Sequence, residues 1–220
     1  MDAIVALSTP WGRSAIGVIR LSGPDAQTLA ARVCASGPQW VPRRASLRRL
    51  VDGDGQTLDD VVVVWMPGPN SYTGDDVVEI SGHGNPVILN AVLDALIAQG
   101  ARPARPGEFT RRALENGRTN VLKAESLQAL IHARSLDGVR DARGGMDGAM
   151  EVESAQMREA LLNVAAELEA RLDHPDDDLS LESDRAVVDA LHRHARAAMS
   201  TADTWKRSKT RIEGATVALV

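Results

Sequence analysis

Residues 77–100 read VVEISGHGNPVILNAVLDALIAQG and predict a strand, a tight turn and a helix. The run Val77–Ser81 is rich in β-branched residues, which favour strands, and the following GHGN is a turn signal. Asn85 followed by Pro86 is typical of a helix start, and Gly100 is typical of a helix stop. A strand joined to a helix by so short a turn predicts a fold that mixes sheet and helix.

The residues before this stretch carry the same mixed pattern. Short apolar runs bounded by Gly and Pro predict further strands at Ile4–Leu7, Ala15–Leu21, Leu47–Val51 and Val61–Met66. The sequence DGDG at 52–55 predicts a hairpin between the last two runs, and SGPD at 22–25 predicts a helix start. A short helix over Gly107–Glu115 follows, inside a basic island that comprises Arg102, Arg105, Arg111, Arg112 and Arg118.

The pattern becomes helical from about residue 121. We expect helices over Leu122–Ser135, from about Asp141 to Leu172, and from Ser183 or Asp184 to about Trp205. In the second of these, apolar residues recur at spacings of three and four. Ala215–Val220 is again strand-like and has no predicted partner strand nearby. The sequence thus predicts an α+β domain at 1–119, an all-α helical part at 120–212, and the first strand of a further domain at 213–220.

Composition excludes several classes of protein. The 220 residues are 44% hydrophobic and 25% charged, which is ordinary globular usage. The net charge of −5 argues against a protein that coats nucleic acid by bulk attraction. The single cysteine, Cys34, which we place in a helix, excludes an internal disulfide and a cysteine-built zinc site. No run is long enough to span a membrane. The short apolar run near the start has no basic segment before it, so we do not expect it to be a secretion signal. With a single cysteine, a reducing, cytoplasmic setting fits.

Several motifs invite a functional reading and favour a structural one. Gly12-x4-Gly17 is followed by Val18-Ile19 rather than Lys-Ser/Thr, so it fails the phosphate-loop pattern. His83, between two glycines, could serve a site but is more typical of a turn residue.

The cluster His174, Asp176, Asp177 and Asp178 lacks regular metal-ligand spacing and is typical of a solvated loop. His192 and His194 lie on different faces of a helix. We therefore nominate no catalytic residue and no metal site.

Arg20 and Glu79 are charged residues inside apolar strand-like runs. A partly buried charge needs a partner. Their chemistry leaves three interpretations open: charges exposed to solvent, an Arg20–Glu79 ion pair, and a ligand clamp. A clamp would suit a ligand that carries both an amidine-like ring edge and carboxylates, because a carboxylate accepts paired N–H donors and a guanidinium grips a carboxylate.

Four stretches together resemble the N-terminal part of the tRNA-modification GTPase family MnmE, also called TrmE. They are TPWGRSAIGVIRLSG (9–23), MPGPNSYTGDDVVEISGHGNP (66–86), ARPGEFTRRALENGR (104–118) and LEARLDHPDDDLSLES (168–183). Their order and spacing match as well. The resemblance implies an aminomethyltransferase-like α+β domain that binds 5-formyltetrahydrofolate or a related tetrahydrofolate and forms a homodimer.

The resemblance also assigns residues and partners. By position, Arg20, Glu79 and Arg118 would contact the folate, with Arg118 standing where the family usually has lysine. The family's helical domain is split by an inserted GTPase domain, whose first strand would correspond to Ala215–Val220. GTP, Mg²⁺ and K⁺ would bind only in that domain, so this stretch would not hydrolyse GTP alone. In the family, an FAD-containing partner of the MnmG type joins in modifying the wobble uridine of tRNA.

Two other functions are consistent with the sequence. One is a freestanding folate-dependent one-carbon transferase, which would need a general base or nucleophile beside the clamp. The other is an inactive, truncated dimerisation fragment. DNA beyond codon 220 would separate these readings, because a G-x4-G-K-[ST] motif there would support the family origin.

Overall fold

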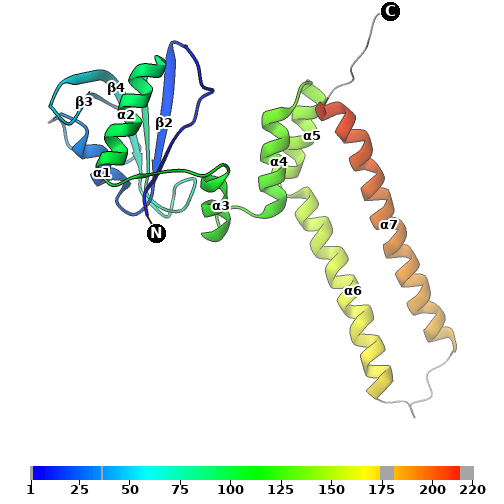
Figure 1. Cartoon of the computed structure of the whole chain (residues 1–220). Coiled ribbons are helices and arrows are strands. Elements are labelled where there is room, and N and C mark those ends of the chain that lie inside the picture. The colour runs from blue at the N-terminus through cyan, green and yellow to red at the C-terminus, as the bar shows by residue number, and fades with distance from the viewer. Residues whose placement is uncertain (1, 36, 174–180, 214–220) are drawn as a thin grey trace, which may run out of the picture. The chain divides into compact units, whose positions relative to one another are not determined.

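The computed structural model describes residues 2–35, 37–173 and 181–213. The chain divides into two compact units, the first over residues 1–119 and the second beginning at Asn120 (Figure 1). Sheet and helix mix in the first unit, whereas the described part of the second unit is helical. The structure therefore confirms an α+β domain followed by a helical domain.

The first unit is built on a six-stranded sheet in the order β3-β4-β5-β2-β1-β6. The strands are β1 (Ile4–Leu7), β2 (Ile16–Ser22), β3 (Ser46–Val51), β4 (Thr57–Met66), β5 (Val77–His83) and β6 (Arg102–Pro103). The pairs β1–β2, β2–β5, β3–β4 and β4–β5 are antiparallel, and β1–β6 is parallel. The expected hairpin at 52–55 joins β3 to β4.

Two helices, α1 (Ala26–Arg32) and α2 (Pro86–Ala98), pack on one face of this sheet (Figure 1). Asn85 caps α2 as expected, since its side-chain oxygen accepts a hydrogen bond from the backbone N–H of Val87 at 2.9 Å. The core between helices and sheet is aliphatic and includes Leu29, Leu89 and Leu96. A third helix, α3 (Glu108–Glu115), follows β6.

Side chains alternate between the two faces along the central strands. Ile19 and Leu21 of β2 and Ile80 of β5 are buried in the core beneath the helices. The intervening residues Arg20 and Glu79 therefore project from the opposite face, which we call the open face. The register pairs Arg20 directly with Glu79.

Four details of the first unit differ from the sequence-based expectation. β4 begins at Thr57, four residues before the expected start at Val61. β5 continues through His83, so the turn begins two residues later than the glycine pattern suggested. β6 was not predicted, because a two-residue strand that contains Pro103 carries no pattern. Cys34 lies beyond the end of α1 in an isolated bridge with Leu50, not in a helix.

The second unit contains α4 (Val121–His132), α5 (Leu136–Met146), α6 (Ala149–Asp173) and α7 (Leu181–Glu213). The expectation of one helix from Asp141 to Leu172 is wrong. A helix already begins at Leu136, capped by the Ser135 side chain. The helical conformation is interrupted at Gly148, whose φ of 88° is left-handed. Glycine adopts that conformation at little cost and so ends a helix. The strand expected at 215–220 lies outside the described residues.

The helices of the second unit leave many apolar side chains in solvent. Leu136 is 75% exposed, Leu172 is 79% exposed and Ile131 is 72% exposed. Within the described residues, no helix combines the length and apolarity needed to cross a bilayer.

Candidate functional site

The centre of the candidate site is the ion pair between Arg20 of β2 and Glu79 of β5 on the open face. Arg20 Nε and Nη2 both donate to Glu79 Oε1, at 2.9 and 2.6 Å. The side chains are 28% and 32% exposed. Of the three interpretations that the sequence left open, the structure shows the ion pair.

This ion pair uses only part of its hydrogen-bonding capacity. Because both arginine donors meet the same oxygen, Glu79 Oε2 accepts no hydrogen bond from the part of the chain that the structure describes. A carboxylate offers about four acceptor sites and a guanidinium five donors. The pair therefore presents a free carboxylate oxygen beside a fixed positive charge, both reachable from solvent.

Two aromatic rings flank the guanidinium of Arg20. Its central carbon lies 5.4 Å from the ring centroid of Tyr72 and 5.9 Å from that of Phe109. These are cation–π distances. The Tyr72 hydroxyl lies 2.9 Å from the Thr110 hydroxyl, so the loop between β4 and β5 is tied to α3. The charged pair thus has a partly apolar wall.

Thr73 anchors that loop to the sheet and to the segment after α3. Its hydroxyl lies 2.7 Å from the Ser22 hydroxyl, and its carbonyl accepts a hydrogen bond from the Asn116 side chain at 2.8 Å. At Gly74, with a φ of 87°, a Cβ would lie 2.8 Å from Asn116 Cβ and 3.2 Å from Arg118 Cγ. Glycine is therefore required for this close approach.

Arg118 lies against the same loop at Gly74, which is two residues beyond Tyr72. Its side chain is exposed, and its backbone N–H donates to the carbonyl of Ala113 at 2.7 Å. Among the described residues, no hydrogen bond or ion pair joins Arg118 to Arg20 or Glu79. The structure brings Arg118 to the loop that forms the wall of the site, but not into the ion pair itself.

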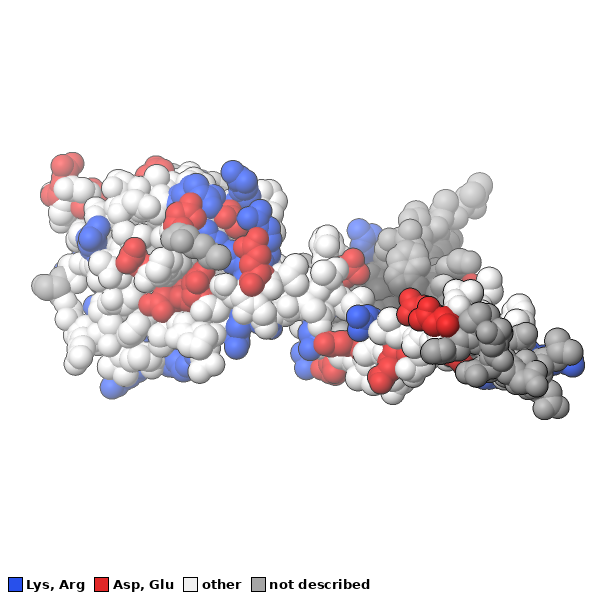
Figure 2. Space-filling model, turned by 90° about the horizontal axis from the view of Figure 1, so that it is seen from below, with Lys and Arg blue, Asp and Glu red and all other residues white. Residues whose placement is uncertain are grey.

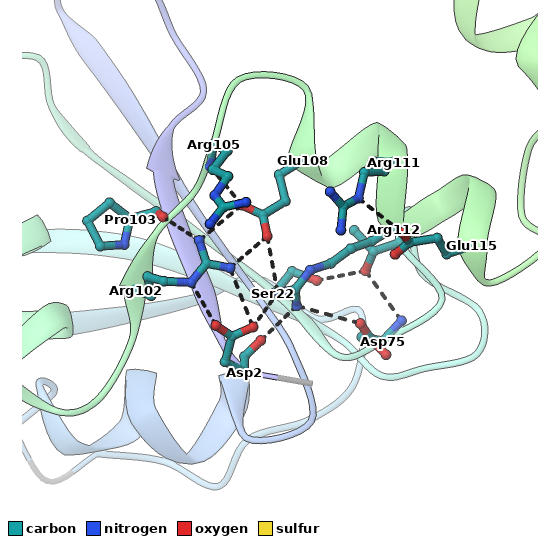
Figure 3. A network of polar contacts seen from close by, with 11 residues as sticks. Asp2, Ser22, Asp75, Arg102, Pro103, Arg105, Glu108, Arg111, Arg112 and Glu115 are labelled. Carbon is teal, nitrogen blue, oxygen red and sulfur yellow. Dashed lines mark hydrogen bonds and ion pairs between the residues drawn. The ribbon is translucent and has the colours of Figure 1, made fainter.

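A charged network holds α3 against the sheet (Figure 3), with Arg112 and Glu108 buried and Asp2 and Arg102 partly exposed. Arg112, only 5% exposed, donates to both the backbone carbonyl and the carboxylate of Asp2 at 2.7 Å. Arg102 donates to Glu108 at 2.7 Å and to Asp2 at 2.7 Å. The network therefore connects the segment before β1, β6 and α3, and it fixes the helix that carries Phe109 and Thr110.

The network stabilises the ionised form of its carboxylates. The guanidinium of Arg102 and the backbone N–H of Arg105 hold the pKa of Glu108 at about 2. Arg102, together with Arg112, also holds the pKa of Asp2 well below its usual range. Both acids are thus charged at neutral pH. Figure 2 shows basic and acidic side chains intermixed on the visible face of the first unit, with no single basic surface there.

The remaining sequence motifs have structural roles where the structure describes them. Gly17 lies within β2, where a Cβ would come within 2.7 Å of Leu89 Cδ2, so this glycine serves helix–sheet packing. His83 ends β5, and its Nδ1 lies 2.7 Å from Asp59 Oδ1. The cluster at 174–178 lies outside the described residues. Within residues 2–35, 37–173 and 181–213, no group of acids, histidines or cysteines is arranged to hold a metal ion.

Sequence reasoning missed the residues that surround and support the ion pair. Tyr72, Phe109 and Thr110 carry no strand or helix signal that connects them to Arg20. Arg112 lies in a run of arginines that looks like a solvated basic island, yet it is buried while Arg111 is exposed. The available signal was that Arg111 and Arg112 are consecutive residues of one predicted helix. Consecutive residues of a helix face different directions, so both cannot lie on the same exposed face.

Comparison with known proteins gives matches over both units. The family model "GTP-binding protein TrmE N-terminus" matches residues 3–118, and "MnmE helical domain" matches residues 121–216. A tRNA modification GTPase MnmE of Phenylobacterium zucineum is 39% identical over 222 residues, covering 100% of this chain and 49% of that protein. One from Halorhodospira halophila is 44% identical over 177 residues, covering 80% of this chain and 37% of that protein. The chain spans about half, or less, of the length of these relatives.

Proposed function

Because this chain belongs to the MnmE family of tRNA modification GTPases, we propose that its first unit binds a reduced folate at the Arg20–Glu79 pair. The ligand is 5-formyltetrahydrofolate or a related tetrahydrofolate. The observation that carries this proposal is the partly exposed ion pair whose second carboxylate oxygen accepts no hydrogen bond from the described chain.

The residues present fit the chemistry of a folate. The pterin ring of a folate presents adjacent N–H donors along one edge, and Glu79 Oε2, which accepts no hydrogen bond from the described chain, can accept from that edge. Glu79 would receive that edge, and Arg20 and Arg118 would meet the carbonyl or carboxylate groups. Tyr72 and Phe109 supply flat apolar surface near the ring. When bound, the folate supplies a one-carbon unit, and the protein's residues hold and orient it.

The contribution of Arg118 gives a direct test of this assignment. Replacing Arg118 with alanine should weaken 5-formyltetrahydrofolate binding by up to about 5-fold, because an exposed charge contributes up to about 1 kcal/mol. Isothermal calorimetry of the variant beside the unmodified chain measures the change. Arg111→Ala is the matched control, since Arg111 is an exposed arginine of α3 that pairs with Glu115. Equal loss in both variants would contradict a specific role for Arg118.

We also propose that the first unit forms a homodimer through the open face of its sheet. Leu47 of β3 is 69% exposed and lies opposite Val62 of β4, which is 42% exposed. Ile16 at the start of β2 is 61% exposed. Apolar side chains projecting together from a sheet face are typical of a covered surface.

Replacing Leu47 with glutamate should shift this dimer toward monomer, because the charge would have to be buried without a partner. Sedimentation velocity at several protein concentrations measures the shift, and we expect at least about a 10-fold weaker dimer. Val87→Glu is the control, since Val87 is 76% exposed but lies on α2, on the other side of the sheet. A Leu47→Glu dimer as strong as the control would place the interface elsewhere.

The wider role we propose follows from family membership and the names of the relatives. The whole protein would hydrolyse GTP with Mg²⁺ and K⁺ in a GTPase domain, and would act with an FAD-containing partner of the MnmG type on the wobble uridine of tRNA in the cytoplasm. The mixed sheet with helices on one face is consistent with the aminomethyltransferase-like fold that we propose for the folate domain.

A further inference from the structure

A cavity lies on the opposite side of the sheet from the Arg20–Glu79 pair. Its volume is about 560 Å³, and it opens between the end of α1, the loop that follows it, and strands β3 and β4. Side chains of mixed character line it, including Gln27, Ala31, Cys34, Trp40, Arg48 and Trp65. A volume of this size is in the range of small-molecule sites.

Where strand β3 borders this cavity, an apolar residue faces solvent and a charged residue faces the core. Leu47 is 69% exposed on the open face, whereas the next residue, Arg48, is only 5% exposed. Arg48 pairs in register with Val61, and Leu50 lies two residues further along the same side of β3. Val61 and Leu50 both belong to the aliphatic core. A guanidinium therefore occupies a core-side position, where burial of an uncompensated charge is costly.

The protein compensates Arg48 with neutral groups only, within the residues that the structure describes. Nη2 donates to the carbonyl of Pro38 at 2.6 Å, and Nε donates to the Ser46 hydroxyl at 3.2 Å. The guanidinium carbon stacks 4.1 Å from the ring centroid of Trp40. No described carboxylate pairs with it, and Nη1 donates to no described acceptor.

The thiol that lines the cavity does not supply a counter-charge. Cys34 also lines the cavity, and burial raises the pKa of its thiol to about 11 although Arg48 opposes that shift. The thiol is thus neutral at physiological pH. The cavity therefore combines one buried positive charge, unused donors and two indole rings, without a negative group among its described lining residues.

We propose that this cavity binds a small organic anion, with a carboxylate or phosphate group on Arg48 and a flat apolar part against Trp40 and Trp65. A guanidinium binds either anion through two parallel hydrogen bonds. The anionic group would provide the negative counter-charge for Arg48, and the apolar part of the ligand would fill the remaining volume. This site is independent of the proposed folate site, because it lies on the other face of the sheet and shares no residue with it.

The test uses three probes of matched shape or charge: 2-naphthoate, its neutral isostere 2-naphthamide, and phenyl phosphate. Titration of the ¹⁵N-labelled chain, followed through the indole N–H signals, reports binding near Trp40 and Trp65. We expect saturable shifts with 2-naphthoate and at least about 10-fold weaker binding of 2-naphthamide, since a charged hydrogen bond is lost. A preference for phenyl phosphate over 2-naphthoate would identify the anion as a phosphate, and the reverse as a carboxylate.

Arg48→Gln should abolish this binding, and Arg49→Gln should leave it unchanged. Arg49 is the matched control because it neighbours Arg48 on β3 but pairs with Asp60 on the open face. Should Arg48→Gln fail to fold, Ala31→Leu narrows the cavity from α1 without touching the charge, and we expect it to block the probe. Equal binding of acid and amide, binding that survives Arg48→Gln or Ala31→Leu, or no binding to the folded chain would each overturn the proposal.

Discussion

Replacing Arg112 with methionine should lower the free energy of unfolding of the first unit by about 3 kcal/mol. Removing one partner of a buried ion pair costs about 3–5 kcal/mol, because the other charge is left without compensation. We expect the lower end of this range, since Asp2 is 55% exposed and both Asp2 and Glu108 keep their ion pairs with Arg102. Urea unfolding followed by the fluorescence of the tryptophans measures the loss.

Arg111→Met is the control for that experiment. Arg111 is the preceding residue of α3, and its ion pair with Glu115 lies at the surface, with side chains 63% and 41% exposed. Exposed helical pairs of this spacing contribute about 0.3–0.5 kcal/mol. A loss for Arg112→Met no larger than that of the control would show that the network does not hold α3 in place.

Replacing Glu79 with alanine should weaken the binding of 5-formyltetrahydrofolate by about 10- to 100-fold. A hydrogen bond to a charged group contributes about 1.5–3 kcal/mol, and each 1.4 kcal/mol is tenfold in affinity. The variant also leaves Arg20 without its partner, so the pterin loses its acceptor and the guanidinium loses its orientation. Calorimetric titration of the variant beside the unmodified chain gives the ratio.

Asp60→Ala is the control for Glu79→Ala. Asp60 is also a strand carboxylate paired with an arginine, but it is 55% exposed and its partner is Arg49, not Arg20. We expect its folate affinity to equal that of the unmodified chain. If Glu79→Ala binds the folate as tightly as this control does, the ion pair is not the binding site.

The sequence predicted most elements of the first unit because their signals are local. Asn85 and Pro86 mark the start of α2, and alternating aliphatic residues mark the central strands. The pairing of Arg20 with Glu79 was not decidable in this way. The two residues lie 59 positions apart, and only the register of β2 against β5 brings them face to face.

The elements that sequence reasoning misplaced depend on conformation or on distant contacts. The break between α5 and α6 lies among several glycines, of which only Gly148 adopts the left-handed conformation that ends a helix there. Arg112 and Arg48 have the residue type of a surface position but are buried, because distant polar groups accept their hydrogen bonds. The family motifs indicated a candidate folate site, whereas the charged network that holds α3 beside it emerged from the fold.

The central claim is that the first unit holds a reduced folate at Arg20 and Glu79. Calorimetric titration of the unmodified chain with 5-formyltetrahydrofolate, with its folded state verified by circular dichroism, tests it most directly. We expect saturable binding of one folate per chain. Absence of binding to the folded chain would contradict the claim and leave the ion pair as a structural link between β2 and β5.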